Sequence, residues 1–169
     1  YRYDAGRQLI AATRFYSPAP GTAVGNQHIS GNRSYPNYII ITDETLLEQA
    51  EEMAAYRSSN NGYRTAIVTQ RQIFNEFSGG VADPVAIRDY LKHLYDIAGL
   101  NEELLPEYLL LMGNTTFDYK GIEEDAPMRN LVFNFQHYVD SDNLSRTRTY
   151  GSDDYFGFLD DNEGEWRSF

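Results

Sequence analysis

The residues with the clearest potential for chemistry are the acids that crowd the last part of the chain. Residues 151–166 read "GSDDYFGFLDDNEGEW" and hold six carboxylates and four aromatic side chains, with no Lys or Arg to balance them. A hard cation such as Ca²⁺ takes about six to eight oxygen ligands from carboxylates and carbonyls. The turn "LDDNEGE" offers such oxygens around the sharp bend that Gly164 permits, from Asp160, Asp161, Glu163 and Glu165.

This turn departs from the best-known calcium-binding pattern, the EF-hand loop. Asp160 and Asn162 could be the first two ligands, but Gly164 then falls where the third ligand should be. Asp153 and Asp154 precede an aromatic group, where a carboxylate could cap a helix, bind a cation or stay exposed. Spacing alone therefore leaves three interpretations open: a bound cation, a solvated turn and a disordered tail.

The chain lacks the patterns of the common catalytic sites. Because it has no cysteine, it holds no disulfide, no thiolate zinc site and no cysteine nucleophile. It also has no G-x-S-x-G elbow, no zinc-type histidine spacing and no glycine-rich nucleotide loop. We expect His28 in a loop, His93 on the solvent side of a helix and His137 in an aromatic, strand-like stretch. No residue of the chain is therefore predicted to be catalytic.

Charge is distributed unevenly along the chain, whose net charge is −11. Residues 1–99 hold ten acids and nine bases, whereas residues 100–169 hold fifteen acids and five bases. Such an acidic balance disfavours nucleic acid and anionic membranes as partners. No apolar run approaches the length of a membrane span. The first residue is Tyr and not Met, which suggests a piece excised from a longer protein.

Strands and helices alternate in the part of the chain that must position these residues. "NYIIIT", residues 37–42, is an unbroken apolar run, which is typical of a strand buried on both faces. A helix capped at Thr42 or Asp43 is predicted to follow and to end at Gly62. Further predicted strands cover 63–69 and 107–114, and further predicted helices cover 70–80 and 84–99. This order predicts a parallel α/β sheet with right-handed crossovers.

The carboxyl ends of parallel strands are where ligands gather in such folds. The loop after Met112 is one candidate, because Gly113 permits a close backbone approach and Asn114 offers an amide oxygen. Residues 130–139 and 153–159 are predicted to be shorter strands between loops. Residues 1–36, rich in Gly, Pro, Asn and Ser, are predicted to be an N-terminal extension, the end of a preceding β domain.

A family resemblance rests on four segments that occur in a fixed order within residues 36–166. They are "NYIIIT", "NEFSGGVADPVAIRDYLKHLYD", "PEYLLLMGNTTFDYKG" and "GSDDYFGFLDDNEG". Together they resemble the gingipain-type cysteine peptidases. The resemblance implies a caspase-like, three-layer α/β fold with a mainly parallel sheet flanked by helices. It assigns residues 37–169 to the first, non-catalytic subdomain of the peptidase unit.

What the resemblance implies about function concerns residues beyond this chain. In the family, the catalytic His and Cys lie in a second subdomain, and this chain has neither a Gly-His-Gly segment nor a Cys. The chain would then support that C-terminal catalytic subdomain, be inactive alone, and meet protein substrates only through the full enzyme. The members that it resembles most act in type IX secretion, exported to the cell surface of Bacteroidetes. The alternatives are a non-catalytic scaffold module of the secretion apparatus and an independent flavodoxin-like ligand-binding domain.

The resemblance also implies a calcium site. Gingipain-type subdomains carry calcium between the end of a strand and the acidic loop. By position, the ligand at the strand end corresponds to Asn114, and the loop ligands fall among Asp160, Asp161, Glu163 and Glu165. The family usually has Asp where this chain has Asn114, and the loss of one anionic ligand should weaken binding. Calcium is therefore the predicted cofactor.

Overall fold

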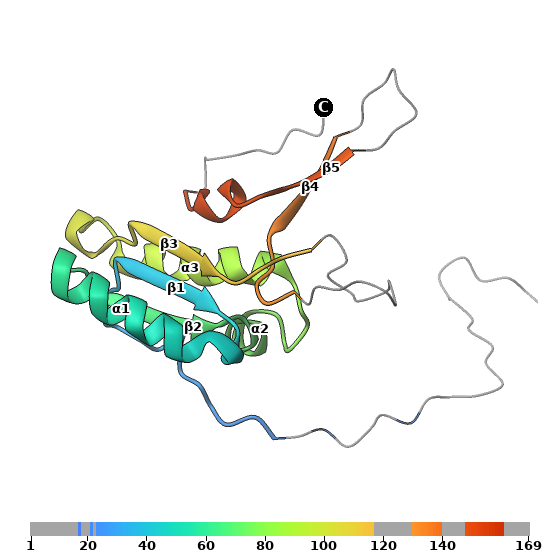
Figure 1. The fold of residues 1–169 in the computed structure, drawn as a ribbon, viewed down its shortest axis with the longest axis horizontal. Coiled ribbons are helices and arrows are strands. Elements are labelled where there is room, and N and C mark those ends of the chain that lie inside the picture. Colours follow the sequence, from blue (N-terminus) through green and yellow to red (C-terminus); the bar gives the residue numbers. More distant parts are fainter. Residues whose placement is uncertain (1–16, 18–20, 22, 117–129, 140–147, 161–169) are drawn as a thin grey trace, which may run out of the picture.

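A parallel β-sheet with helices on both faces forms the centre of the molecule (Figure 1). The computed structural model describes residues 17, 21, 23–116, 130–139 and 148–160. Within these residues the sheet has three strands in the order β2-β1-β3, and a separate sheet pairs β4 with β5 in antiparallel fashion. The predicted α/β class with a mainly parallel sheet is confirmed.

The central strand, β1 (Tyr38–Thr42), is buried along its whole length. It pairs on one side with β2 (Thr65–Thr69) and on the other with β3 (Tyr108–Met112), so that Ile40 lies opposite Ile67 and Leu110. Successive side chains of a strand point to opposite faces. Ile39 and Ile41 therefore enter the core on one face of the sheet, and Tyr38 and Ile40 enter the core on the other.

One face of the sheet is covered by α1 (Leu47–Asn61), which buries Ala50 and Ala54 against it. A short 3-10 turn, η1 (Glu44–Leu46), precedes α1, and Asp43 caps this turn by accepting a hydrogen bond from the Thr45 N–H. Gly62, in the left-handed region at φ 70°, ends the helix as predicted.

The other face is covered by α2 (Gln70–Phe77) and α3 (Pro84–Ala98). Thr69 and Gln72 form a reciprocal capping box at the start of α2. Asp83 caps α3 and Pro84 occupies its first turn, as the sequence predicted. α3 contributes five of the fourteen buried residues on this face, more than any other element. Burial of Tyr90 within this core raises the pKa of its hydroxyl. A 3-10 turn, η2 (Glu102–Leu104), leads from α3 to β3.

The C-terminal elements differ from the prediction. Residues 153–159 do not form a strand: Asp154–Gly157 make a 3-10 helix, η3, which buries Phe156 in the core beneath α3. β4 (Phe135–Val139) lies within the predicted strand at 130–139. Its partner β5 (Arg148–Ser152) was not predicted, because "RTYGS" has no apolar alternation. None of the helices among the described residues is long and apolar enough to cross a membrane.

The N-terminal segment contributes to the same core. Ile29, only 9% exposed, packs with the side chains beneath α2 and α3. Two residues of the predicted extension 1–36 therefore contact the α/β unit: Ile29 packs in its core and Ser30 hydrogen-bonds to Glu76. The domain boundary at 36/37 stays a prediction.

Candidate functional site

The carboxyl end of the sheet is held together by side chains of the strands themselves. Thr42 is fully buried, and its hydroxyl donates a hydrogen bond of 2.8 Å to the Met112 carbonyl, which ties the end of β1 to the end of β3. Asp43 is 8% exposed and accepts hydrogen bonds from the N–H and the hydroxyl of Thr45, at 3.0 and 2.8 Å. These contacts make Asp43 a helix cap, so its carboxylate serves the fold at this edge.

Gly113 lets a distant segment approach the end of β3. A Cβ at this position would lie 2.9 Å from both Leu131 Cβ and Val132 Cγ2, closer than real Cβ atoms come, and φ is 156°. The next residue completes the contact: the Asn114 carbonyl accepts hydrogen bonds from the N–H groups of Leu131 and Val132, at 2.9 and 3.2 Å. Residues 130–132 are thereby fixed onto the strand end.

Polar side chains link the turn that holds the half-buried Asn114 to residues 130–134. The Thr115 hydroxyl lies 3.3 Å from the side-chain oxygens of Asn130 and Asn134, and the Thr116 N–H donates to the side-chain oxygen of Asn130. The Gln70 amide donates to the Leu131 carbonyl at 2.7 Å. The sequence singled out Asn114 as the ligand in this turn, and it gave no sign of Gln70, Asn130 and Asn134, which come from distant segments.

Two buried oxygens of this cluster have no hydrogen-bond partner among the described residues. They are Gln70 Oε1 and Thr116 Oγ1. Amide and hydroxyl oxygens without partners are costly when buried. Such oxygens are also ligands of the kind that a hard cation binds. They were missed by the sequence analysis, since nothing in the local sequence marks them.

Only two of the five predicted calcium ligands, Asn114 and Asp160, lie among the described residues. Asp160 is exposed and follows a segment that α3 holds: Arg88 Nε donates to the Phe158 carbonyl at 2.9 Å and Lys92 Nζ to the Leu159 carbonyl at 3.2 Å. The other three predicted ligands, Asp161, Glu163 and Glu165, lie outside the described residues.

The acids that are described do not form a metal centre. In the part of the chain that the structure covers, no group of three or more His, Cys, Asp or Glu side chains is placed to hold a metal ion. The geometry therefore assigns no role to calcium, and the calcium site stays a prediction.

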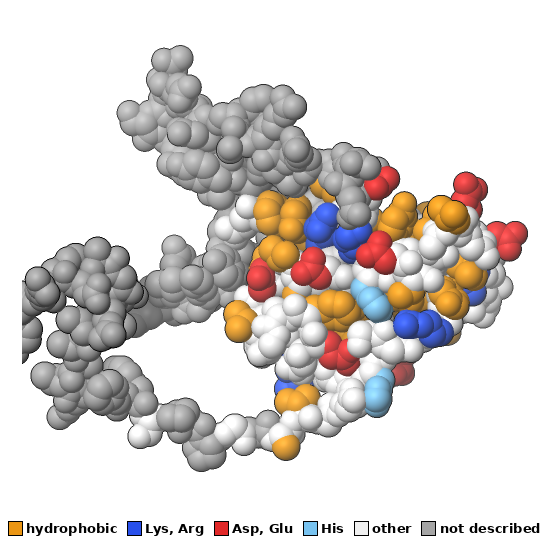
Figure 2. All heavy atoms as spheres, turned by 180° about the vertical axis from the view of Figure 1, so that it is seen from behind, with side chains coloured by type: hydrophobic (Ala, Val, Ile, Leu, Met, Phe, Trp, Pro, Cys, Tyr) orange, Lys and Arg blue, Asp and Glu red, His pale blue; other side chains and the backbone are white. Residues whose placement is uncertain are grey.

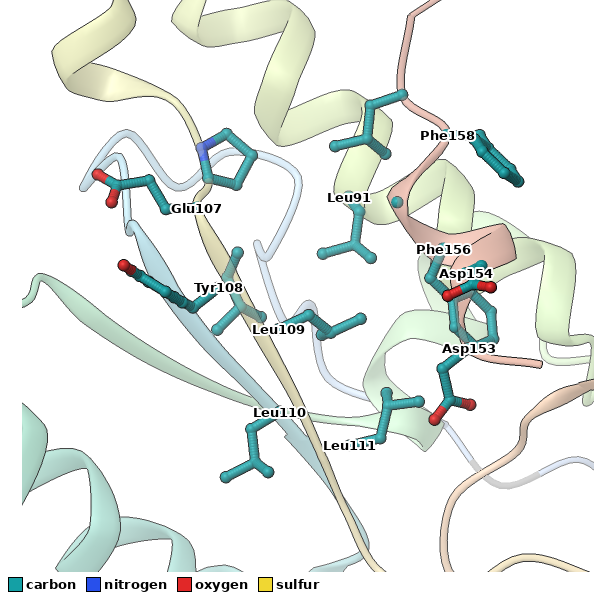
Figure 3. A pocket seen from close by; sticks show the side chains of 14 residues that line it. Leu91, Glu107, Tyr108, Leu109, Leu110, Leu111, Asp153, Asp154, Phe156 and Phe158 are labelled. Atoms are coloured by element: carbon teal, nitrogen blue, oxygen red, sulfur yellow. The ribbon is translucent and has the colours of Figure 1, made fainter. Parts of the chain in front are cut away.

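A groove of about 920 Å³ runs between β3 and the segment 153–159 (Figure 3). Its floor is apolar, from Leu109 and Leu111 on the strand and from Leu91 and Phe156 opposite them. Carboxylates of Asp153, Asp154 and Glu107 stand among its lining residues. A lining of this kind suits an extended apolar peptide segment better than a nucleotide or another anionic ligand.

The helical face behind the sheet carries acidic and basic side chains interspersed (Figure 2). Here Glu76 holds the N-terminal segment: its carboxylate accepts from the N–H of Ile29 at 3.0 Å and from the N–H and hydroxyl of Ser30 at 3.0 and 2.7 Å. Partial burial raises the pKa of Glu76, but these hydrogen bonds outweigh it and hold the pKa below its ordinary value.

His93 does not face solvent as the sequence suggested. Its Nε2 lies 2.7 Å from the Ser30 carbonyl, and its ring packs beside Phe77 with centroids 5.9 Å apart. His93 therefore helps to hold Ser30 against α3. The prediction failed because the segment that covers this histidine is about sixty residues away in sequence.

Comparisons with known proteins agree with this architecture. The profile of Peptidase family C25 matches residues 32–167. A search of the curated proteins gave no match. Among solved structures, the chain is similar to the crystal structure of dimeric latent PorU from Porphyromonas gingivalis, with 36% identity and a TM-score of 0.63. That similarity covers 75% of this chain but 12% of the PorU chain, so this chain spans a small part of the length of its relative. Since the family profile covers most of its residues, the chain belongs to peptidase family C25, the gingipain family.

Proposed function

We propose that this chain is the supporting, non-catalytic half of a PorU-like cysteine endopeptidase. One observation carries the proposal: a chain that matches a cysteine peptidase family over residues 32–167 contains no cysteine. A cysteine peptidase needs a thiolate nucleophile and a general acid/base, together with backbone donors for the oxyanion. The nucleophile must therefore come from a different part of the polypeptide.

The residues described here fit a structural role. The buried β1 and the capped helices α2 and α3 make a rigid layer, because their side chains interdigitate in one core. Arg88 and Lys92 anchor the carbonyls of Phe158 and Leu159 to that layer. In the proposed enzyme this layer holds the orientation of the C-terminal catalytic subdomain, which binds the protein substrates.

The proposed cellular location and secretion role are taken from the similarity to PorU. We place the full polypeptide among exported proteins of the cell surface, with a role in type IX secretion, by its similarity to PorU. Calcium is part of the same proposal: Asn114 and the acids Asp160, Asp161, Glu163 and Glu165 would hold the ion, which would fix the acidic loop. Its chemistry there would be structural, since Ca²⁺ supplies coordination and charge compensation.

The test is a peptidase assay of the full-length polypeptide on a mixture of peptide substrates, with and without iodoacetamide. The proposal predicts turnover that alkylation of thiols abolishes. Turnover that survives complete alkylation would contradict a cysteine mechanism. Absence of turnover before alkylation would instead favour the scaffold module, a binding protein of the secretion apparatus.

A further inference from the structure

Three tyrosine rings pack together at the amino end of the parallel sheet. Tyr38 begins β1 and lies opposite Tyr108, which begins β3, while Tyr63 comes two residues before β2. The ring of Tyr63 stacks on that of Tyr38 with centroids 5.5 Å apart, and it lies 5.0 Å from that of Tyr108. In Figure 3 the Tyr108 ring points away from the groove, on the side of β3 opposite Leu109. These three rings, the tyrosine cluster, therefore belong to the face of the sheet that α1 covers.

Arg57 of α1 lies over this cluster. The Cζ atom of its guanidinium is 5.5 Å from the centre of the Tyr38 ring and 5.9 Å from that of the Tyr56 ring. At such distances a cation is attracted to an aromatic face. The Nε atom of Arg57 is buried and has no hydrogen-bond partner among the described residues. Two aromatic rings therefore hold the guanidinium in place, without a hydrogen bond to its Nε.

Arg57 is the exception among the basic side chains of residues 23–116. It makes no hydrogen bond and no ion pair within that range, although the chain holds 25 acids against 14 bases. The other basic side chains of the range all donate to a carbonyl or pair with a carboxylate: Arg33, Arg64, Arg71, Arg88 and Lys92. A guanidinium carries five N–H donors and a permanent charge, so half-burial without an anion is costly. An anion supplied from outside these residues would remove that cost.

The surface around Arg57 is aromatic and accessible. Tyr56, whose ring contacts the guanidinium, is 58% exposed, and Tyr108, whose ring packs 5.9 Å from that of Tyr38, is 45% exposed. A hydrogen bond with Tyr108 raises the pKa of the Tyr63 hydroxyl, and the positive charge of Arg57 opposes this rise, so the charge reaches the hydroxyls of the cluster. Tyrosine and arginine are the residues in which binding energy concentrates at protein interfaces.

We propose that Arg57 and the tyrosine cluster bind a carboxylate in an acidic segment of another protein chain. The edge of the guanidinium donates two parallel hydrogen bonds to the two carboxylate oxygens, which is the pairing that its planar fork favours. The exposed rings of Tyr56 and Tyr108 pack against apolar side chains next to that acid. A carboxylate fits better than a phosphate, because Glu107 beside the cluster and the net charge of −11 repel a dianion more strongly than a single charge.

Protection of Arg57 from phenylglyoxal, which modifies accessible guanidinium groups, tests the site in the full-length polypeptide. The probe is acetyl-Phe-Glu-Phe-amide, and its control is acetyl-Phe-Gln-Phe-amide, which lacks only the charge. For a Kd of about 1 mM, a probe concentration of about 10 mM fills roughly nine sites in ten and slows the modification of Arg57 about tenfold. Mass spectrometry of the digested protein follows Arg57 beside Arg33, an exposed arginine whose modification rate the probe should leave unchanged.

Substitution of one exposed ring tests the aromatic part of the site. Tyr56→Ser should raise the probe concentration that gives half protection about fivefold, which is the effect of losing one important contact residue. Val81→Ser removes a similarly exposed side chain between α2 and α3, which cover the opposite face of the sheet, and should leave that concentration unchanged. Equal effects of the two substitutions would contradict a role of the rings in binding.

Other outcomes would overturn the inference as a whole. No slowing, or equal slowing by the Glu and Gln peptides, would show that the site does not recognise a carboxylate. Equal slowing by inorganic phosphate at the same concentration would assign the site to a phosphorylated ligand. An Arg57 that reacts only after the full-length polypeptide is unfolded would show that another part of the same polypeptide covers it. None of these results bears on thiol-dependent turnover, so the inference and the proposed function stand or fall separately.

Discussion

At the scale of single residues, Gly113 shows how one missing side chain fixes the end of a strand. Its Cα hydrogen faces Leu131 and Val132, where a Cβ would come within 2.9 Å of each side chain. We expect Gly113→Ala to lower the free energy of unfolding by about 1–3 kcal/mol, the usual cost of overpacking. Urea denaturation measures this change.

The matched control for that substitution is Gly25→Ala, since nothing lies within 4 Å of a Cβ built there. It should change the free energy of unfolding by less than about 0.5 kcal/mol. Equal effects of the two substitutions would show that residues 130–132 do not rest on Gly113.

The acidic loop gives a second prediction at this scale. If Asp161 and Glu163 are calcium ligands, Ca²⁺ should raise the melting temperature of the protein. At a concentration of about 100 times Kd, the gain is about 2.7 kcal/mol, which amounts to several degrees. The double substitution Asp161→Ala with Glu163→Ala should remove this gain, as differential scanning fluorimetry would record.

The control for the calcium experiment is the double substitution Glu48→Ala with Glu51→Ala, on the exposed side of α1. This variant should retain the full calcium shift, since those acids lie on a solvated helix face. A melting temperature that Ca²⁺ leaves unchanged in the full-length polypeptide would rule out the site.

At the scale of elements, Glu76 of α2 binds the N-terminal segment. Its contribution to the free energy of unfolding depends on pH. The hydrogen bonds from Ser30 and Ile29 hold its pKa below the unfolded value of about 4.3. A lowered folded pKa means that the stabilisation is present above the unfolded pKa and is lost as pH falls through the folded pKa. Because Glu76 is only partly buried, the stabilisation is modest.

We therefore expect Glu76→Gln to lower the free energy of unfolding by about 1 kcal/mol at pH 7. The difference between the variant and the parent should shrink as pH falls below about 4. Glu48→Gln, on an exposed face of α1, should leave the free energy of unfolding unchanged at pH 7 and below about pH 4. A difference that grows in acid would show that Glu76 is not stabilised as a carboxylate.

Elements with strong local signals could be predicted from the sequence, and those set by distant contacts could not. The apolar run of residues 38–42 predicts β1, and Asp83 before Pro84 predicts the start of α3. η3 was mistaken for a strand because its aromatic residues resemble one, whereas the burial of Phe156 beneath α3 decides its conformation. At the candidate site, the strand-end rule placed Asn114 correctly at the end of β3. The docking of Leu131 onto it depends on a contact that no local pattern encodes.

At the scale of the whole molecule, the proposed enzyme consists of a part that reacts and a part that supports it. Residues 1–169 alone should hydrolyse no peptide substrate, because they contain no thiol. Incubation of this chain with a mixed peptide library, followed by mass spectrometry, checks the prediction. New termini that appear in proportion to the amount of chain would contradict it.

The most direct measurement of the central claim is to find the residue that reacts in the full-length polypeptide. Labelling with a peptidyl acyloxymethyl ketone, followed by digestion and mass spectrometry, maps the adduct. The account predicts one modified cysteine outside residues 1–169 and loss of turnover in proportion to labelling. An adduct on a residue within 1–169, or full turnover after complete labelling of that cysteine, would contradict it.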